Sequence, residues 1–162
     1  WCRSASAQLG DTGVALLGDS LHSFPPDLGQ GVNAGFSDVS NLLDLWSTAA
    51  SAQQQEALKT YGEKQAVEAE AICRLLPVGM PYQYGLPFSV GKGLFFAALL
   101  GRLALHKLLP RMFTPPVVFL VTDAPPRKYS NILEDHRRNT RRFRLLAGSL
   151  ALLVALTWWR RA

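Results

Sequence analysis

Residues that could do chemistry gather between positions 18 and 38, where carboxylates, a histidine and several glycines lie close together. A short apolar run, Val14–Leu17, precedes them and predicts a buried strand. This strand would end at Gly18 and Asp19, which places a carboxylate at its carboxyl end. Such a carboxylate can accept hydrogen bonds from hydroxyl groups, for example those of a sugar-alcohol chain.

A helix start follows this loop and adds a second set of binding groups. Glycines at 29 and 31 precede apolar residues that recur every three to four positions, at Phe36, Val39, Leu42, Leu43 and Trp46. The first N–H groups of a helix have no partner inside it, and the helix dipole adds partial positive charge there. Because glycine lets a ligand approach the backbone closely, the stretch predicts a site for a polar ligand.

The same stretch carries a pattern of fixed spacing. Its positions are Gly18, Asp19, His22, Pro26, Gly29, Gln30, Gly31, Asn33, Gly35 and Asp38. This pattern resembles the second FAD motif of the flavin-dependent aromatic hydroxylases. The resemblance implies that Asp19, with Gly18 before it, contacts the ribityl chain of FAD.

The resemblance also implies roles for the helix start and its loop. Gly31, Val32 and Asn33, preceded by Gln30, would offer backbone N–H groups to the flavin ring and nearby oxygens. Pro26 and Gly29 would line the substrate side of the ring.

His22 by itself is more typical of a loop residue with local hydrogen bonds than of a catalytic base. Nothing near it has metal-ligand spacing. We therefore assign no catalytic side chain and no metal ligand within this chain.

The implied fold is a mostly α fragment of an α/β, Rossmann-like FAD-binding fold. It comprises a strand, a loop and a pair of long helices, followed by a C-terminal membrane helix. The G-x-G-x-x-G turn that binds the ADP half of FAD in this family does not occur among the 162 residues. We therefore expect a C-terminal fragment, or a truncated gene product, of a longer flavoprotein.

The helix pair is predicted over about 32–50 and 54–76, and 3–13 reads as a polar connection into the strand. The second helix has candidate apolar-face residues at Leu58, Tyr61, Val67, Ile72 and Leu75, and it is expected to end at Pro77 and Gly79. We expect three parts: the C-terminal portion of an FAD-binding domain (1–76), a helical and loop region (77–136) and a basic flank with an anchor (137–162).

The middle region combines a loop, an apolar helix and a short apolar run. Residues 77–93 are rich in Pro and Gly and either pack on the core or contribute to a substrate- or membrane-facing surface. Residues 94–109 predict an apolar helix that is too short and too charged to span a bilayer, so it is either buried or interfacial. The β-branched run at 117–121 predicts a strand.

Tyr129 opens a polar helix shortly after that apolar run. A segment of this kind resembles the C-terminal part of the kynurenine hydroxylase branch of the family. There such a tyrosine helps to hold the substrate carboxylate, so the resemblance implies substrate binding by Tyr129.

The basic charge of the chain is concentrated in its last 36 residues. Residues 127–162 hold nine Lys/Arg against two acids, whereas 1–126 carry a net −2, within a total of +5. This asymmetry argues against nucleic-acid binding and favours a charged flank beside something apolar.

An uncharged stretch, Leu145–Trp159, lies between five arginines and a closing arginine pair and ends in two tryptophans. It predicts a membrane anchor, with a buried terminal helix as the alternative. The arginine distribution would leave the protein body on the cytosolic side, and the resemblance makes the mitochondrial outer membrane one candidate location.

The function implied is an FAD-dependent monooxygenase that uses NAD(P)H and O₂ to hydroxylate a small aromatic substrate, with this fragment inactive alone. Two alternatives stay open: an epoxidase of the same superfamily, and a non-catalytic, membrane-anchored truncated product.

Two cysteines, Cys2 and Cys73, do not make a disulfide framework.

Overall fold

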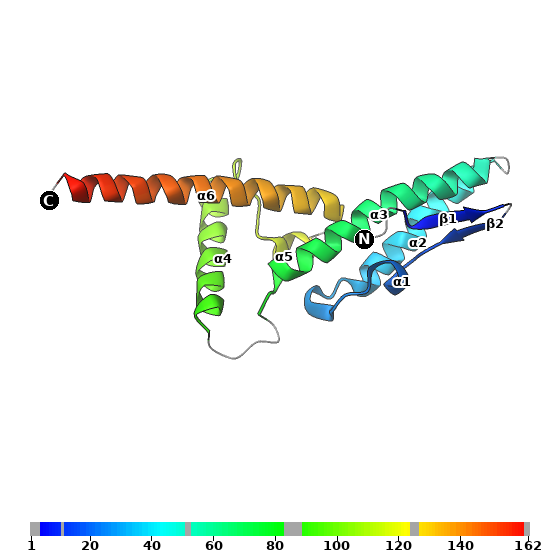
Figure 1. Cartoon of the computed structure of the whole chain (residues 1–162), viewed down its shortest axis with the longest axis horizontal. Helices are drawn as coiled ribbons and strands as arrows, with labels where there is room; N and C mark the ends of the chain where they lie inside the picture. Colours follow the sequence, from blue (N-terminus) through cyan, green and yellow to red (C-terminus); the bar gives the residue numbers. More distant parts are fainter. Residues whose placement is uncertain (1–3, 11, 51–52, 83–88, 124–126, 161–162) are drawn as a thin grey trace.

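The computed structural model describes residues 4–10, 12–50, 53–82, 89–123 and 127–160. In chain order its elements are β1 (Ser6–Leu9), β2 (Thr12–Ala15), α1 (Asp19–His22), η1 (Pro26–Leu28), α2 (Gly31–Thr48), α3 (Gln54–Gly79), α4 (Val90–Leu108), α5 (Val117–Leu120) and α6 (Tyr129–Trp159) (Figure 1). The described chain is therefore mostly helical with one two-stranded sheet, as expected for a fragment of the FAD-binding fold.

The strand region differs from the prediction. β1 pairs with β2 as an antiparallel hairpin, from Ser6 opposite Ala15 to Leu9 opposite Thr12, so the segment expected to be a polar connection contains a strand. The predicted buried strand is wrong in position and in burial, because β2 ends at Ala15 and is largely exposed. The ladder stops where the Leu17 N–H turns to the Ser20 hydroxyl instead of a neighbouring strand.

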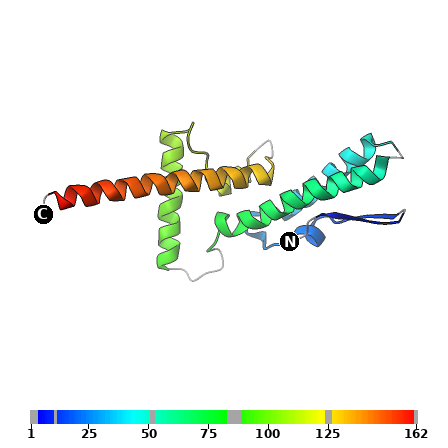
Figure 2. The ribbon, with the colours of Figure 1, turned by 45° about the horizontal axis from the view of Figure 1, so that its top comes forward.

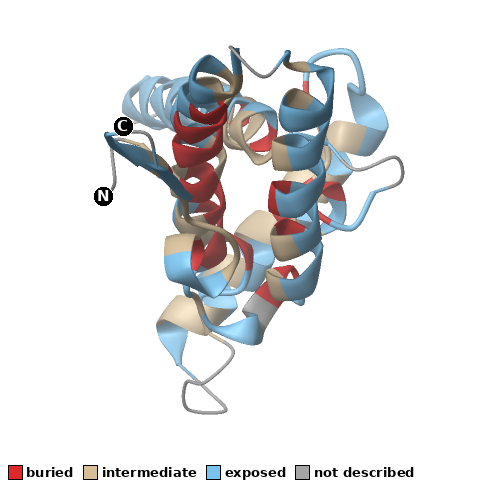
Figure 3. Cartoon of the chain, turned by 90° about the vertical axis from the view of Figure 1, so that its right-hand side faces the viewer, coloured by how far each residue is buried: buried red, intermediate tan, exposed pale blue. Residues whose placement is uncertain are grey.

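Helix α3 is the element on which the others pack. It contacts α2, α6 and the hairpin, and it buries Leu58, Tyr61, Ile72 and Leu75 as predicted. Figure 3 shows the buried positions gathered where the elements face one another. Val67 is 55% exposed, so its assignment to the apolar face is wrong.

The end of α3 also differs from the prediction. The helix runs to Gly79 with Pro77 inside it. Proline removes one N–H donor, and in the last turn that loss affects a single intrahelical bond, so the helix continues.

The apolar core joins segments far apart in sequence. Its buried members are Leu28, Leu75, Leu76, Val117, Leu120, Val121 and Ile132. They come from η1, the C-terminal part of α3, α5 and its end, and the first turns of α6. Full burial of one such side chain contributes about 1.5–3 kcal/mol, so this cluster fixes the beginning of α6 beside α3.

The predicted strand at 117–121 is a short helix, α5, and this correction has a physical reason. Pro116 is extended and caps the segment, and the helix then turns Val117, Leu120 and Val121 into the core at helical spacing. No described strand lies beside it to supply a β ladder.

Helix α2 begins one residue before its predicted start and ends at Thr48. Its buried residues are Ala34 and Asp38, whereas Phe36, Val39, Leu43 and Trp46 are exposed. The predicted period is correct, but no described residue covers that apolar face.

Helices α4 and α6 cross each other in both ribbon views (Figures 1 and 2). α4 begins where the Ser89 hydroxyl accepts the Lys92 N–H, and none of its residues is buried. The buried alternative for 94–109 is therefore wrong for the described chain. Residues 83–88 of the predicted loop lie outside the described residues.

Candidate functional site

A buried carboxylate joins the strand end, the following loop and α3. Asp38 of α2 is fully buried and accepts three hydrogen bonds. The donors are the Gly18 N–H at 2.7 Å, the His22 ring Nε2 at 2.7 Å and the Gln65 side-chain amide at 2.5 Å. Because these donors come from the strand end, α1 and α3, Asp38 sets where the segment carrying Asp19 lies.

Backbone geometry brings that segment against α2. Gly18 has φ 57°, a left-handed conformation that favours glycine. A methyl group on Gly35 would lie 3.8 Å from the Cα of Gly18, so the chain before Asp19 touches the second turn of α2. Asp19 itself opens α1 and is exposed.

The start of α2 is left open toward a ligand. No side chain caps it, and the Ala34 N–H makes the first intrahelical bond, to Gln30 O at 2.8 Å. The N–H groups of Gly31, Val32 and Asn33 precede that bond and have no acceptor within the helix. A Cβ on Gly31 would meet nothing within 4 Å, so there is room for a bound group.

Pro26 and Gly29 shape the approach to this helix start. Pro26 opens η1, and Gly29 closes it with φ 61°, its N–H bonded to Pro26 O at 3.0 Å. This left-handed turn directs the chain into α2. The predicted cofactor-binding residues thus form one continuous surface loop that returns to Gly18.

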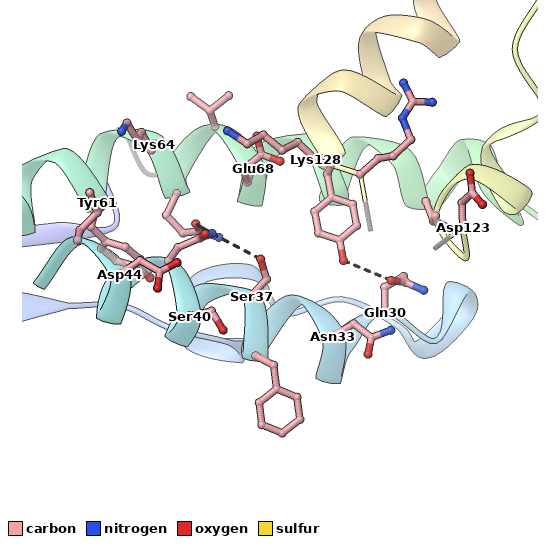
Figure 4. A pocket seen from close by; sticks show the side chains of 18 of the residues that line it. Gln30, Asn33, Ser37, Ser40, Asp44, Tyr61, Lys64, Glu68, Asp123 and Lys128 are labelled. Atoms are coloured by element: carbon pink, nitrogen blue, oxygen red, sulfur yellow. Dashed lines mark hydrogen bonds between the residues drawn. The ribbon is translucent and has the colours of Figure 1, made fainter. Parts of the chain in front are cut away.

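Gln30 links the motif to the far end of the chain. Its Nε2 donates to Leu28 O, and its Oε1 accepts a hydrogen bond of 3.3 Å from the Tyr129 hydroxyl (Figure 4). Ninety-nine residues separate these two side chains in sequence. The structure therefore places the predicted substrate residue Tyr129 beside the predicted flavin loop.

A groove of about 1120 Å³ runs between α2 and α3 and is closed at one end by the segment before α6. Gln30, Asn33 and Tyr129 are the predicted site residues that line it, together with Arg127 and Lys128. The Tyr129 hydroxyl reaches across this space to Gln30 at the start of α2. Asp19, Gly18, Pro26, Gly29, Gly31 and Val32 do not line the groove.

Burial raises the pKa of the two tyrosines that line the groove, Tyr129 and Tyr61. Desolvation, and then the negative charges of Asp38 and Glu68, raise the pKa of Tyr129 above its usual 10. Its hydroxyl consequently remains protonated and can donate a hydrogen bond. Tyr61 is similarly kept neutral, since burial and Asp38 raise its pKa, and its hydroxyl donates to Leu16 O at 2.9 Å.

His22 was expected to be a loop residue with local hydrogen bonds, but it lies in α1, is buried, and bonds to Asp38, 16 residues away in sequence. Burial lowers its pKa, but the hydrogen bond and charge of Asp38 outweigh this effect and raise the pKa above 6.5. Its Nδ1 has no hydrogen-bond partner among the described residues.

Two functional residues escaped the sequence reasoning. The sequence pattern marks Asp38 only as the last position of the motif, and it gives Gln65 no role. An acidic residue on a predicted helix is normally expected to face solvent. The one signal for burial of Asp38 is its position four residues after Ala34, on the same side of α2. Gln65 carries no such signal, because its role depends on how α2 and α3 pack.

Comparison with known proteins agrees with this geometry. Residues 4–75 match the family described as FAD binding domain. Kynurenine 3-monooxygenase of Candida albicans is 42% identical over 60 residues, which cover 37% of this chain and 13% of that protein. The predicted resemblance is thereby confirmed for the N-terminal part of the chain, which is similar to the FAD binding domain family and to part of a kynurenine 3-monooxygenase.

Two further relatives have different names. The mitochondrial ubiquinone biosynthesis monooxygenase COQ6 of Rattus norvegicus is 57% identical over 37 residues, 23% of this chain and 8% of that protein. The 3-(3-hydroxy-phenyl)propionate/3-hydroxycinnamic acid hydroxylase of Burkholderia cenocepacia is 38% identical over 65 residues, 38% of this chain and 12% of that protein. The chain thus spans 8–13% of the length of these three relatives. No solved structure gives a significant match.

Proposed function

We propose that the full-length protein containing this chain is an FAD-dependent monooxygenase that hydroxylates a small aromatic molecule with NAD(P)H and O₂. The observation that carries the proposal is the open start of α2, on a helix whose Gly35 and buried Asp38 hold Gly18 against its second and third turns. All three relatives named above are monooxygenases or hydroxylases by name. The proposal keeps the division of the chain into an FAD-binding portion (1–76), a helical and loop region (77–136) and a basic flank with an anchor (137–162).

The residues of the chain have distinct roles in this proposal. The Asp19 carboxylate accepts hydrogen bonds from the ribityl hydroxyls, and the N–H groups of Gly31, Val32 and Asn33 stabilise negative charge on the flavin ring. Bound FAD supplies the redox chemistry of the reaction. Gly18, Pro26, Gly29 and Gln30 keep the loop in the conformation that presents these groups.

Tyr129 is proposed to orient the substrate. Its neutral hydroxyl, near Lys128 at the groove, can donate its single proton to a carboxylate on an aromatic substrate in place of Gln30. Three cations and three acids line the groove, and Arg127 is paired with Asp135 at 2.8 Å, so the proposal of an acidic substrate rests on the Tyr129 hydroxyl and Lys128.

Attachment to a membrane is proposed for the C-terminal half of α6. By length and composition, α6 could cross a bilayer. Its most apolar 18-residue stretch is not buried. Arginines at 137–144 precede it and tryptophans at 158 and 159 close it, which suits the two interfaces. The arginine distribution would leave the protein body on the cytosolic side; the organelle, with the mitochondrial outer membrane as a candidate, belongs to this proposal.

Isotope incorporation tests the proposed reaction. The purified full-length protein is incubated with FAD, NADH or NADPH, ¹⁸O₂ and kynurenine or 3-(3-hydroxyphenyl)propionate as probe substrates. We expect one ¹⁸O atom in a hydroxylated product and substrate-dependent oxidation of the nicotinamide. Incorporation into an epoxide would favour the epoxidase, and a protein that binds no flavin would support the non-catalytic alternative.

A further inference from the structure

Helix α4 presents an apolar surface that no described residue covers. Its large exposed side chains are Val90, Leu94, Phe96, Leu100 and Leu108, with exposed fractions from 46% to 83%. At 3.6 residues per turn, Val90, Leu94 and Leu108 fall within about 40° of one another around the helix axis. Phe96 and Leu100 lie about 80–120° from Val90 in the opposite sense, so the five exposed side chains cover an arc of about 160° around the axis, which we call the α4 face.

The side of α4 that does make contacts is occupied by α6 and the following turn. Arg102 lies over the Phe143 ring at 5.6 Å and reaches the His136 ring at 3.4 Å. His106 bonds to Phe113 O at 2.7 Å. The Phe143 ring also lies close to Gly101, where an added Cβ would be 3.7 Å from it, so α6 crosses α4 at the edge of the α4 face that carries Leu94 and the rest of the face points outward.

Charge around this face has one sign. Between residues 71 and 122 the sequence contains no Asp or Glu, whereas Lys92, Arg102, Lys107 and Arg111 lie on α4 or just after it. The crossing with α6 adds more, because Phe143 is flanked by Arg142 and Arg144. Around the helix axis, Lys107 lies between Phe96 and Leu100, and Lys92 lies about 40° beyond Phe96 at the edge of the α4 face. An apolar face bordered and interrupted by cations is complementary to the surface of an anionic bilayer.

The crossing of α4 and α6 determines how α4 would lie relative to a bilayer. α4 meets α6 at His136 and Phe143, at the level of the basic segment, and the apolar part of α6 continues beyond α4 (Figures 1 and 2). The body formed by α2, α3 and the hairpin lies on the other side of α4 from the C-terminus (Figure 1). A bilayer crossed by the end of α6 would therefore have α4 lying along its surface.

We propose that α4 is an interfacial helix that lies in the plane of an anionic membrane, with the α4 face in the acyl boundary and Lys92, Lys107 and Arg111 at the phosphates. The proposal rests on the proposed anchoring by α6 and adds a second, distinct lipid contact. Two crossed contacts would fix the orientation of the flavin-binding body on the membrane, which a single helix cannot do.

Spin-label depth measurements test this arrangement. In the full chain with Cys2→Ser and Cys73→Ser, single cysteines are placed at Val90, Leu94 and Leu108, labelled, and reconstituted with phosphatidylcholine vesicles containing phosphatidylserine. Collision with O₂ and with a water-soluble nickel complex gives the depth of each label. Labels at Leu150 and Leu156 report on α6 separately. A label on Glu63→Cys, an exposed position of α3, is the aqueous control.

We expect the three α4 labels to share one shallow depth. A depth that changes steadily from Val90 to Leu108 would mean that α4 spans the bilayer, and labels as accessible as the Glu63 control would mean that α4 faces water or a protein; either result overturns the proposal. Deep α6 labels with aqueous α4 labels would reject the α4 contact while leaving the anchor intact.

A charge variant supplies an independent readout. Lys92→Gln and Lys107→Gln should each weaken binding of the full chain to phosphatidylserine-containing vesicles by about fivefold and leave binding to pure phosphatidylcholine unchanged. An equal effect on both vesicle types, or none on either, would contradict an anionic headgroup contact.

Discussion

Asp38 and His22 form a fully buried hydrogen-bonded pair, 2.7 Å apart, in which the same carboxylate oxygen also accepts the Gly18 N–H. The pair belongs to α2 and α1, and Gln65 of α3 holds the other oxygen. One carboxylate thus connects the chain before Asp19 to both long helices. We expect flavin binding and folding stability to depend on it together.

Removing this carboxylate should be severe. Asp38→Ala leaves His22, Gln65 and the Gly18 N–H without their acceptor, and breaking a buried pair of this kind costs about 3–5 kcal/mol. Urea denaturation measures the change. Asp44→Ala, an exposed acid on the same helix, is the matched control and should change the free energy of unfolding by less than about 0.5 kcal/mol. Similar effects for the two variants would contradict the role given to Asp38.

The pair also predicts a pH dependence. The pKa of His22 is raised in the folded state, so its stabilising contribution is fully present below about 6.5 and is lost as the pH rises through the folded pKa. The difference in unfolding free energy between the wild type and His22→Gln should therefore shrink with increasing pH. A difference that grows with pH would show that His22 is neutral in the folded protein.

His136 should act in the opposite direction. Burial, followed by the charges of Arg102 and Arg137, lowers its pKa to about 4. The unfolded chain then binds more protons than the folded one between pH 4 and about 6.5, so stability rises with pH across that window. His136→Gln should flatten this part of the profile of unfolding free energy against pH. An unchanged slope would mean that His136 is solvated.

Tyr129 should affect substrate rather than flavin. Tyr129→Phe removes the hydroxyl that bonds to Gln30, and loss of a hydrogen bond to a charged group should raise KM for an acidic aromatic probe by roughly 10- to 100-fold. The flavin content of the purified full-length protein should remain that of the wild type. Loss of flavin with unchanged KM would place Tyr129 in the cofactor site instead.

The sequence predicted the helix pair and the start of α2 well, for a local reason. Glycines, an acid and an apolar period at fixed spacing determine where α2 begins, whatever lies around it. The same glycines and acid account for the open start of α2 and for the contact between α2 and Gly18.

Elements that depend on distant partners were predicted less well. The run at 117–121 has strand propensity, yet it has no strand to pair with and becomes α5, because Pro116 and the core positions impose helical spacing. β1 was missed because it is only four residues long, mostly exposed, and contains no apolar run. The contact between Gln30 and Tyr129 joins segments that no local pattern relates.

Flavin stoichiometry in the Asp19→Ala variant of the full-length protein tests the central claim most directly, with Glu63→Ala as an exposed-acid control. Absorbance at the flavin bands gives moles of FAD retained per mole of protein after purification, and an unchanged far-ultraviolet spectrum shows that the variant is folded. We predict substoichiometric FAD in Asp19→Ala and full retention in Glu63→Ala. Equal and full retention in both variants would contradict the assignment of Asp19 and of this loop to the flavin.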